Sequence, residues 1–75
     1  MKNNLSNTIN LNHLRKVYLL LCDNRGVVFS INDVCEFSGL YRKQVECVLN
    51  ALVERQVINK TIKKAGINNR YFYHA

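Results

Sequence analysis

The sequence has no proline, only three glycines, and neither an internal repeat nor a low-complexity linker. A chain of 75 residues without such a linker fits one domain and leaves little room for a second. The apolar run Val17–Cys22 is far shorter than the about 20 residues that span a membrane. The first residues are polar and rich in Asn, unlike a signal peptide. We therefore expect a cytoplasmic protein with no membrane partner.

The cysteines form no recognised motif. Cys22, Cys35 and Cys47 are too far apart for a Cys-x-x-Cys motif, and their odd number argues against a disulfide framework. Each lies in an apolar helical context, so we predict three buried free thiols, in keeping with a reducing cytosol. His13 and His74 stand alone in polar contexts and are predicted to be solvated. The sequence therefore predicts no metal site and no cofactor.

The motifs of catalysis are missing as well. The chain has no Gly-rich phosphate loop, no paired carboxylates, and no Ser, Cys or Lys nucleophile beside an evident base. Of the cysteines only Cys47 lies near cations, which the activation of a thiol requires. We therefore predict that the protein is not an enzyme.

Acidic residues are few and unevenly placed. The chain has 11 Lys and Arg against 5 Asp and Glu, a net charge of +6. All five acids lie within residues 23–54, whereas residues 55–75 carry five cations and no acid. Such a basic end favours a polyanionic partner. On composition alone, a surface that only keeps the protein in solution explains the charge equally well.

What the chain does contain is a succession of helix and strand signals. Residues 1–10 show no sustained periodicity and are predicted to form a flexible arm ahead of a folded domain over residues 11–75. A helix is predicted for Leu11–Asp23, with Asn10 as its N-cap and Gly26 beyond its end. Its apolar side is expected to comprise Leu11, Leu14, Val17, Tyr18 and Leu21.

Two more helices are predicted in the middle of the chain. Ser30 and Asp33 have the spacing of a capping box at the start of a short helix, Ile31–Phe37, which Ser38-Gly39 ends. A longer helix is expected over about Tyr41–Arg55. One apolar stripe predicts its buried face: Val45, Val48, Leu49 and Leu52.

Strand signals stand before and after these two helices. Val27–Phe29 is β-branched and aromatic but long enough only for a short strand. Val57–Lys63 alternates in polarity, with Ile58 and Ile62 on one face. Turn residues at 65–69 and the strand Arg70–His74 complete a hairpin. Tyr18, Phe29 and Phe72 are predicted to lie in the core. Tyr71 and Tyr73 are predicted to pack against the protein rather than to stack on bases.

Three segments within Ser30–Tyr73 and its flank resemble the winged helix-turn-helix regulators. SINDVCEFSGL is similar to the first helix and turn of the motif, YRKQVECVLNALVERQVI to the recognition helix, and KTIKKAGINNRYFYH to the wing hairpin. Size and layout are also similar to those of the small fimbrial-operon regulators of the PapI and FaeA type. The resemblance implies an α+β, mainly helical fold with a three-helix core and a small antiparallel β wing.

The sequence departs from that family at Gln56, where a glycine usually separates the recognition helix from the wing. The position often needs a left-handed backbone, which a residue with a Cβ atom adopts at some cost. The departure concerns the geometry of this joint and not the fold.

The resemblance implies that the helix over about 41–55 enters the DNA major groove, where residues near its N-terminus reach base edges. Arg can bond guanine and Gln can bond adenine with two hydrogen bonds, and Lys reaches phosphate or guanine. Glu46 on the same face would repel phosphates, although it can accept a hydrogen bond from cytosine. The same side chains also suit a solvated helix face. The candidate contacts are Tyr41, Arg42, Lys43, Gln44 and Asn50.

The wing, over about 60–71, is expected to lie on the DNA backbone or in the minor groove through Lys63, Lys64 and Arg70. The sequence therefore predicts a regulator of transcription that binds double-stranded DNA sequence-specifically. Winged helices also serve as protein adaptors, so an interaction module without DNA binding stays open. A homodimer formed through the N-terminal arm and the Leu11–Asp23 helix, or a partner regulatory protein, stays open too.

Overall fold

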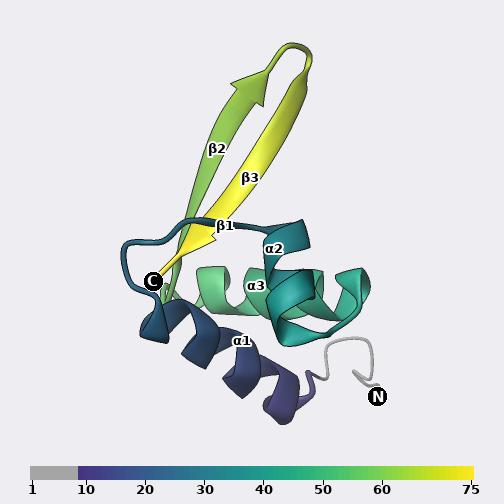
Figure 1. The fold of residues 1–75 in the computed structure, drawn as a ribbon, viewed down its shortest axis with the longest axis vertical. Coiled ribbons are helices and arrows are strands. Elements are labelled where there is room, and N and C mark those ends of the chain that lie inside the picture. Colours follow the sequence, from purple (N-terminus) through teal and green to yellow (C-terminus); the bar gives the residue numbers. More distant parts are fainter. Residues whose placement is uncertain (1–8) are drawn as a thin grey trace.

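Three helices and a three-stranded antiparallel sheet make up the structure, a computed structural model that describes residues 9–75 (Figure 1). The predicted α+β composition and the order of the elements are confirmed. Most of the predicted arm lies outside the described residues. Along the chain the elements are α1 (Leu11–Asp23), β1 (Phe29–Ser30), α2 (Ile31–Ser38), α3 (Arg42–Glu54), β2 (Asn59–Ala65) and β3 (Asn68–His74).

Local side-chain hydrogen bonds begin the first two helices. The Asn10 side chain accepts from the backbone N–H of Asn12 at 2.8 Å and caps α1. At α2 the Ser30 hydroxyl accepts from the Asp33 N–H, and the Asp33 carboxylate accepts from the Ser30 N–H, both at 3.1 Å. Gly39, at φ 75°, ends α2 in the left-handed conformation that glycine adopts without strain. The predicted caps and breaker are thus confirmed.

The end of α3 is a two-bond Schellman cap built without glycine. The Gln56 N–H donates to the Val53 carbonyl at 2.9 Å, and the Val57 N–H donates to the Leu52 carbonyl at 3.0 Å. This geometry needs a left-handed residue, and Gln56 has φ 60°. It is the one non-glycine residue with positive φ in the part of the chain that the structure describes. The left-handed backbone expected at this joint is therefore present.

The sheet has the order β1-β3-β2. The short β1 pairs only with the base of β3, through Phe29 opposite Tyr73 and Ser30 opposite Phe72. Strands β2 and β3 pair over seven positions and are joined by the two-residue turn Gly66-Ile67. The turn is shorter than predicted and both strands run further towards it, so the hairpin stands well out from the helices (Figure 1).

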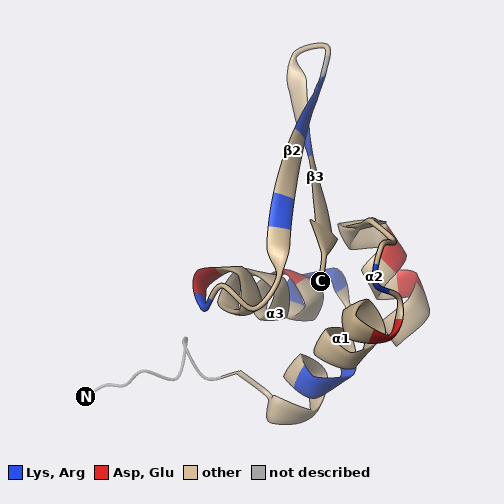
Figure 2. Cartoon of the chain, turned by 90° about the vertical axis from the view of Figure 1, so that its left-hand side faces the viewer, with Lys and Arg blue, Asp and Glu red and all other residues tan. Residues whose placement is uncertain are grey.

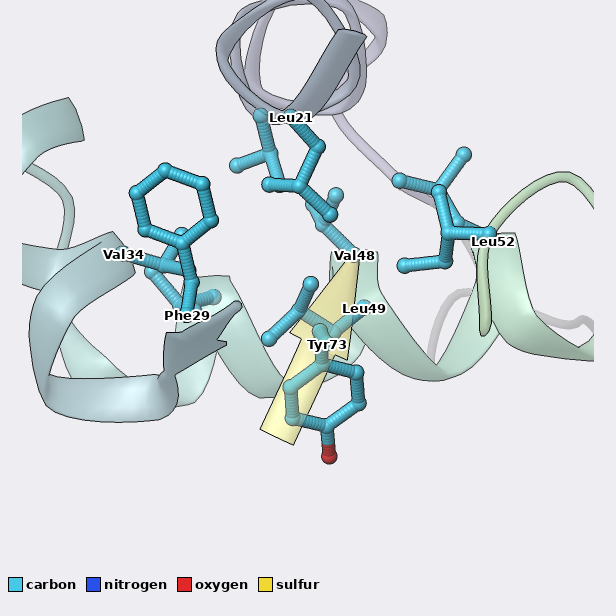
Figure 3. Packing of buried hydrophobic residues seen from close by; sticks show 10 residues of the cluster. Leu21, Phe29, Val34, Val48, Leu49, Leu52 and Tyr73 are labelled. Carbon is cyan, nitrogen blue, oxygen red and sulfur yellow. The ribbon is translucent and has the colours of Figure 1, made fainter. Parts of the chain in front are cut away.

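The core lies between the helices and the base of the sheet (Figure 3). Leu21 of α1, Val34 of α2 and Leu49 of α3 are completely buried, and Phe29 and Tyr73 close the core from the sheet. Complete burial of such a side chain contributes about 1.5–3 kcal/mol relative to exposure. The stripe predicted for α3 is confirmed, since all four members are buried: Val45, Val48, Leu49 and Leu52.

Several burial predictions were wrong. Leu11 is 74% exposed, because it lies about 120° around α1 from Val17 at about 100° per residue. Ile62, for which only the strand face and not burial was predicted, is 57% exposed, because the helices cover only the base of the hairpin. Phe72 is half-buried rather than in the core, and so is Tyr18. The residue that enters the core from β3 is Tyr73, which lies on the opposite face of the strand from Phe72.

The prediction of three buried thiols was also wrong. Cys22 and Cys35 are half-buried and Cys47 is exposed, all three being free cysteines. Cys47 lies two residues from both Val45 and Leu49, about 200° around α3 from each. An apolar context along the sequence did not place this thiol on the apolar face of the helix.

Candidate nucleic-acid interface

The β2–β3 hairpin carries four exposed cations, Lys60, Lys63, Lys64 and Arg70. Figure 2 shows the Lys and Arg segments along the hairpin and the acidic segments on the helices. Residues 55–75 contain no acid that could pair with the hairpin cations. The hairpin therefore presents a positive charge with no neutralising group of its own.

The hairpin cations are divided between its two faces. Residues directly opposite each other in an antiparallel pair point to the same side. Lys63 is opposite Arg70, so these two share one face. Lys64 is opposite Asn69 and shares the other face with Lys60, a cation that the sequence analysis did not select. Lys63 and Lys64, predicted together as wing contacts, thus point in opposite directions.

Aromatic rings lie beneath two of these ammonium groups. The Lys60 Nζ atom is 4.5 Å from the centroid of the Tyr71 ring and 6.0 Å from that of Tyr73. On the other face the Lys63 Nζ atom is 5.6 Å from the Phe72 ring. Such cation–π contacts at exposed sites contribute about 0.5–1 kcal/mol each. They hold the charges close to the hairpin surface. Burial raises the pKa of the Tyr73 phenol above its ordinary value.

The first turn of α3 holds Arg42 in a defined position. Its Nε atom donates to the Glu46 carboxylate at 3.1 Å, and its Nη1 atom donates to the Asn32 side chain of α2 at 3.2 Å. The Arg42–Glu46 pair is exposed, so it contributes little to stability. Its effect is to direct the guanidinium along α2. Tyr41 precedes the helix as its N-cap residue and is 79% exposed.

The predicted contacts of α3 do not all lie on one face. Gln44 is half-buried, and its Oε1 atom accepts from the Tyr41 N–H at 3.0 Å. It lies about 200° around the helix from Arg42, on the side towards the start of α1. Lys43 and Asn50 are both exposed, opposite the buried stripe. The structure thus puts these two on the outward face, with Arg42 and Gln44 on opposite flanks.

An open groove of about 400 Å³ joins α2, the start of α3 and β3. It brings Arg42 and Arg70 together, although 28 positions separate them in the sequence. The free edge of β3 forms one wall, because β1 pairs with this strand only at its base. Sequence reasoning chose both arginines but had no signal that they share one groove. The lining consists of Ser30, Ile31, Asn32, Asp33, Arg42, Asn69, Arg70, Tyr71 and Phe72.

The same cations also protect the sheet. Strand β2 lies at an edge, and an exposed edge can pair with another chain. Charged side chains, Lys above all, prevent such pairing. Edge protection accounts for the lysines on β2, and it applies to Arg70 as well, because β1 pairs with β3 only at Phe72 and Tyr73 and leaves the β3 edge at Arg70 free. Arg70 differs from the three lysines in lining the groove together with Arg42, so it is the hairpin cation that most specifically indicates a ligand.

Within residues 9–75 no group of three or more His, Cys, Asp or Glu side chains is arranged to hold a metal ion. Over the same range no helix combines the length and the apolar character needed to cross a membrane. No protein-family model, curated protein or solved structure matches this chain.

Proposed function

We propose that the protein is a winged helix-turn-helix regulator of transcription that binds double-stranded DNA in the cytoplasm and catalyses no reaction. In this proposal α2 and α3 are the helix-turn-helix, α3 is the recognition helix, and the β2–β3 hairpin is the wing. One observation carries it. Four exposed cations, Lys60, Lys63, Lys64 and Arg70, lie on a projecting hairpin without a single acid, beside α3, whose Lys43 and Asn50 are exposed within the residues that the structure describes.

The helix and the wing have different tasks in this proposal. The outward side of α3 mixes Lys43 and Asn50 with the acids Glu46 and Glu54, so it has little net attraction for phosphates. Such a face suits hydrogen bonding to base edges in the major groove. The wing, which has no acid, supplies the attraction for the phosphate backbone, a term that depends on salt and not on sequence.

The groove between the helices and the wing supports this division. Arg42 reaches it from α3 and Arg70 from β3. A guanidinium bonds phosphate oxygens with two parallel hydrogen bonds. One DNA strand passing along the groove would meet both arginines, which would fix the register of α3 in the neighbouring major groove. Binding in this position requires the Arg42–Glu46 ion pair to open or to share its donors.

The test is binding of the protein to its own upstream DNA and to a scrambled duplex, measured by fluorescence anisotropy across a salt series. We expect tighter binding to the upstream DNA, and affinity for both duplexes that falls linearly with salt on logarithmic axes. Equal affinity for the two duplexes would remove the claim of sequence specificity. No binding to either at low salt would remove DNA binding altogether. Sedimentation of the complex gives the stoichiometry and decides whether a homodimer binds.

A protein-interaction adaptor is the second candidate function, and exposed apolar side chains away from the wing favour it. Leu11 and Leu19 are exposed on α1, and Phe37 is exposed at the end of α2. Scattered exposed apolar residues are common on monomers, so this observation is weaker than the charge of the hairpin. An adaptor that binds through apolar contacts would keep its affinity as salt rises, which a DNA-binding protein does not.

A further inference from the structure

The tip of the hairpin carries an apolar side chain that has no structural partner. Ile67 is the second residue of the β2–β3 turn and is 100% exposed. Turns of this kind are usually made by Gly, Asn, Asp or Ser, and a β-branched apolar residue is unusual there. Because Ile67 packs against nothing, its side chain contributes nothing to the stability of the fold. Its apolar surface is available to contact a ligand.

The turn holds Ile67 in a fixed place. Gly66 has φ 68°, and Ile67 is not among the residues with positive φ. A two-residue turn with positive φ only at its first position is of type II′, which matches the twist of the strands. Ala65 is paired with Asn68 directly beneath the turn. Ile67 therefore lies at the tip of a hairpin whose strands are paired up to the turn, and not in a loose loop.

The surroundings of Ile67 favour a polyanion. Lys63, Lys64 and Arg70 all lie within four residues of it, and no acid does. Asn68 and Asn69 follow it directly and are exposed. Asparagine amides can donate to the acceptors that base pairs present in the minor groove. An isolated apolar side chain ringed by cations and amides has the chemistry of minor-groove proteins that insert an apolar wedge between base steps.

We propose that Ile67 is such a wedge, entering the minor groove next to the major groove that α3 occupies, unstacking one base step and bending the duplex. The inference rests on the proposed DNA binding. The hairpin cations bring the tip to the phosphates, and Ile67 exchanges full exposure to water for contact with the faces of two bases. Unstacking opposes insertion, so pyrimidine–purine steps such as TA, which kink most easily, are the preferred targets.

The wedge is tested on a duplex with a central stretch of alternating T and A, in which every second base step is TA, so that a TA step lies at the tip or next to it in any register. Fluorophores at the two ends report bending by energy transfer, and 2-aminopurine in the TA steps reports unstacking by a rise in fluorescence. We expect wild-type protein to raise both signals, with a bend of about 20–90°. A duplex of stiff A-tracts should give a much smaller response.

The decisive variant is Ile67→Ser, with Ile62→Ser as its matched control. Both isoleucines are exposed on the hairpin, but Ile62 lies in the middle of β2 and not at the tip. We expect Ile67→Ser to bind the TA duplex within about tenfold of wild type, because the phosphate contacts remain, and to abolish both signals. Ile62→Ser should keep them. Circular-dichroism melts of the two variants establish that both are folded.

Wild-type protein that binds the TA duplex without changing either signal would overturn the wedge and leave DNA binding intact. The same holds if Ile67→Ser bends and unstacks the duplex as wild type does. Failure of the wild-type protein to bind any duplex at low salt would overturn the proposed function and the wedge together. In that case an acidic protein with an apolar pocket becomes the partner that the tip fits.

Discussion

The helical body and the β2–β3 hairpin differ in the burial of their side chains. Nine of the ten buried hydrophobic residues lie outside the hairpin, in the helices, β1 and the α3–β2 joint. Of the hairpin side chains that the structure describes, only Tyr73 is buried, and the cations are all on the outside. The buried core and the cations that have no neighbouring acid are thus carried by separate parts of the chain. It follows that hairpin substitutions can report on binding without disturbing the fold.

The largest expected effect is on the body. We predict that Leu49→Ala lowers the free energy of unfolding by about 2–5 kcal/mol, since Leu49 is fully buried in the core. At about 0.05–0.15 kcal/mol per residue, a domain of 75 residues has only about 4–11 kcal/mol to lose. Thermal and urea melts measure the change.

Leu11→Ala is the control, because Leu11 is mostly exposed, and it should change stability by less than about 0.5 kcal/mol. An unchanged melt for Leu49→Ala would contradict the assignment of the stabilising core to the helical body.

The next effect should appear mainly in binding. Replacing Lys63 and Arg70 together by Ala is expected to weaken binding to all duplexes and to lower the melting temperature by no more than about 4–8 °C, since the lost Lys63–Phe72 contact is worth about 0.5–1 kcal/mol. The slope of log affinity against log salt should become shallower by about 1.8, which is about 0.9 for each lost phosphate contact. Anisotropy titrations across a salt series measure it.

The double variant with Ala at Lys60 and Lys64 is the matched control for this test. It removes the same charge from the opposite face of the same hairpin. Since Arg70 lines the groove with Arg42, the Lys63 and Arg70 pair should have the larger effect. Equal effects of the two double variants would mean that net charge, and not the geometry of the groove, governs binding.

A smaller effect is expected where body and hairpin meet. Arg42→Ala should weaken binding to all duplexes alike and make the salt slope shallower by about 0.9, because the proposal places Arg42 on a phosphate in the groove. Anisotropy titrations on the upstream and scrambled duplexes across a salt series measure it. A loss of about 1–3 kcal/mol confined to the upstream duplex would assign Arg42 to a base instead. Gln44→Ala on the opposite flank should act first on stability, because it removes the hydrogen bond to the Tyr41 N–H.

The smallest expected effect is a gain in stability. Gln56→Gly is expected to stabilise the protein by less than about 1 kcal/mol, because relief of about 1–2 kcal/mol of left-handed strain is opposed by the added entropy of the unfolded chain. Urea unfolding measures it. The neighbouring Arg55 has an ordinary φ of −85°, so Arg55→Gly should lose stability instead. A loss in Gln56→Gly would reveal a role for the Gln56 side chain that outweighs the strain.

Features that depend on neighbours along the chain could be predicted before the fold was known. The Asn10 cap, the Ser30–Asp33 capping box and the stop at Gly39 follow from residues at most four positions apart, and all are present. The buried stripe of α3 follows from the helical period in the same way. The left-handed backbone at Gln56 was also predictable from the resemblance, because its conformation depends only on how α3 ends.

Features that depend on which surfaces meet could not be predicted and emerged from the packing of the elements. Ile62 continues the apolar alternation of Ile58, yet it is exposed, because no helix extends beneath the outer hairpin. The register of β2 against β3 separated Lys63 from Lys64 and joined Lys63 to Arg70. Arg42 and Arg70 came to line one groove because α2 and β3 pack side by side. A pattern of residues fixes which way each side chain points within its own element, whereas contacts between elements depend on packing that no local pattern encodes.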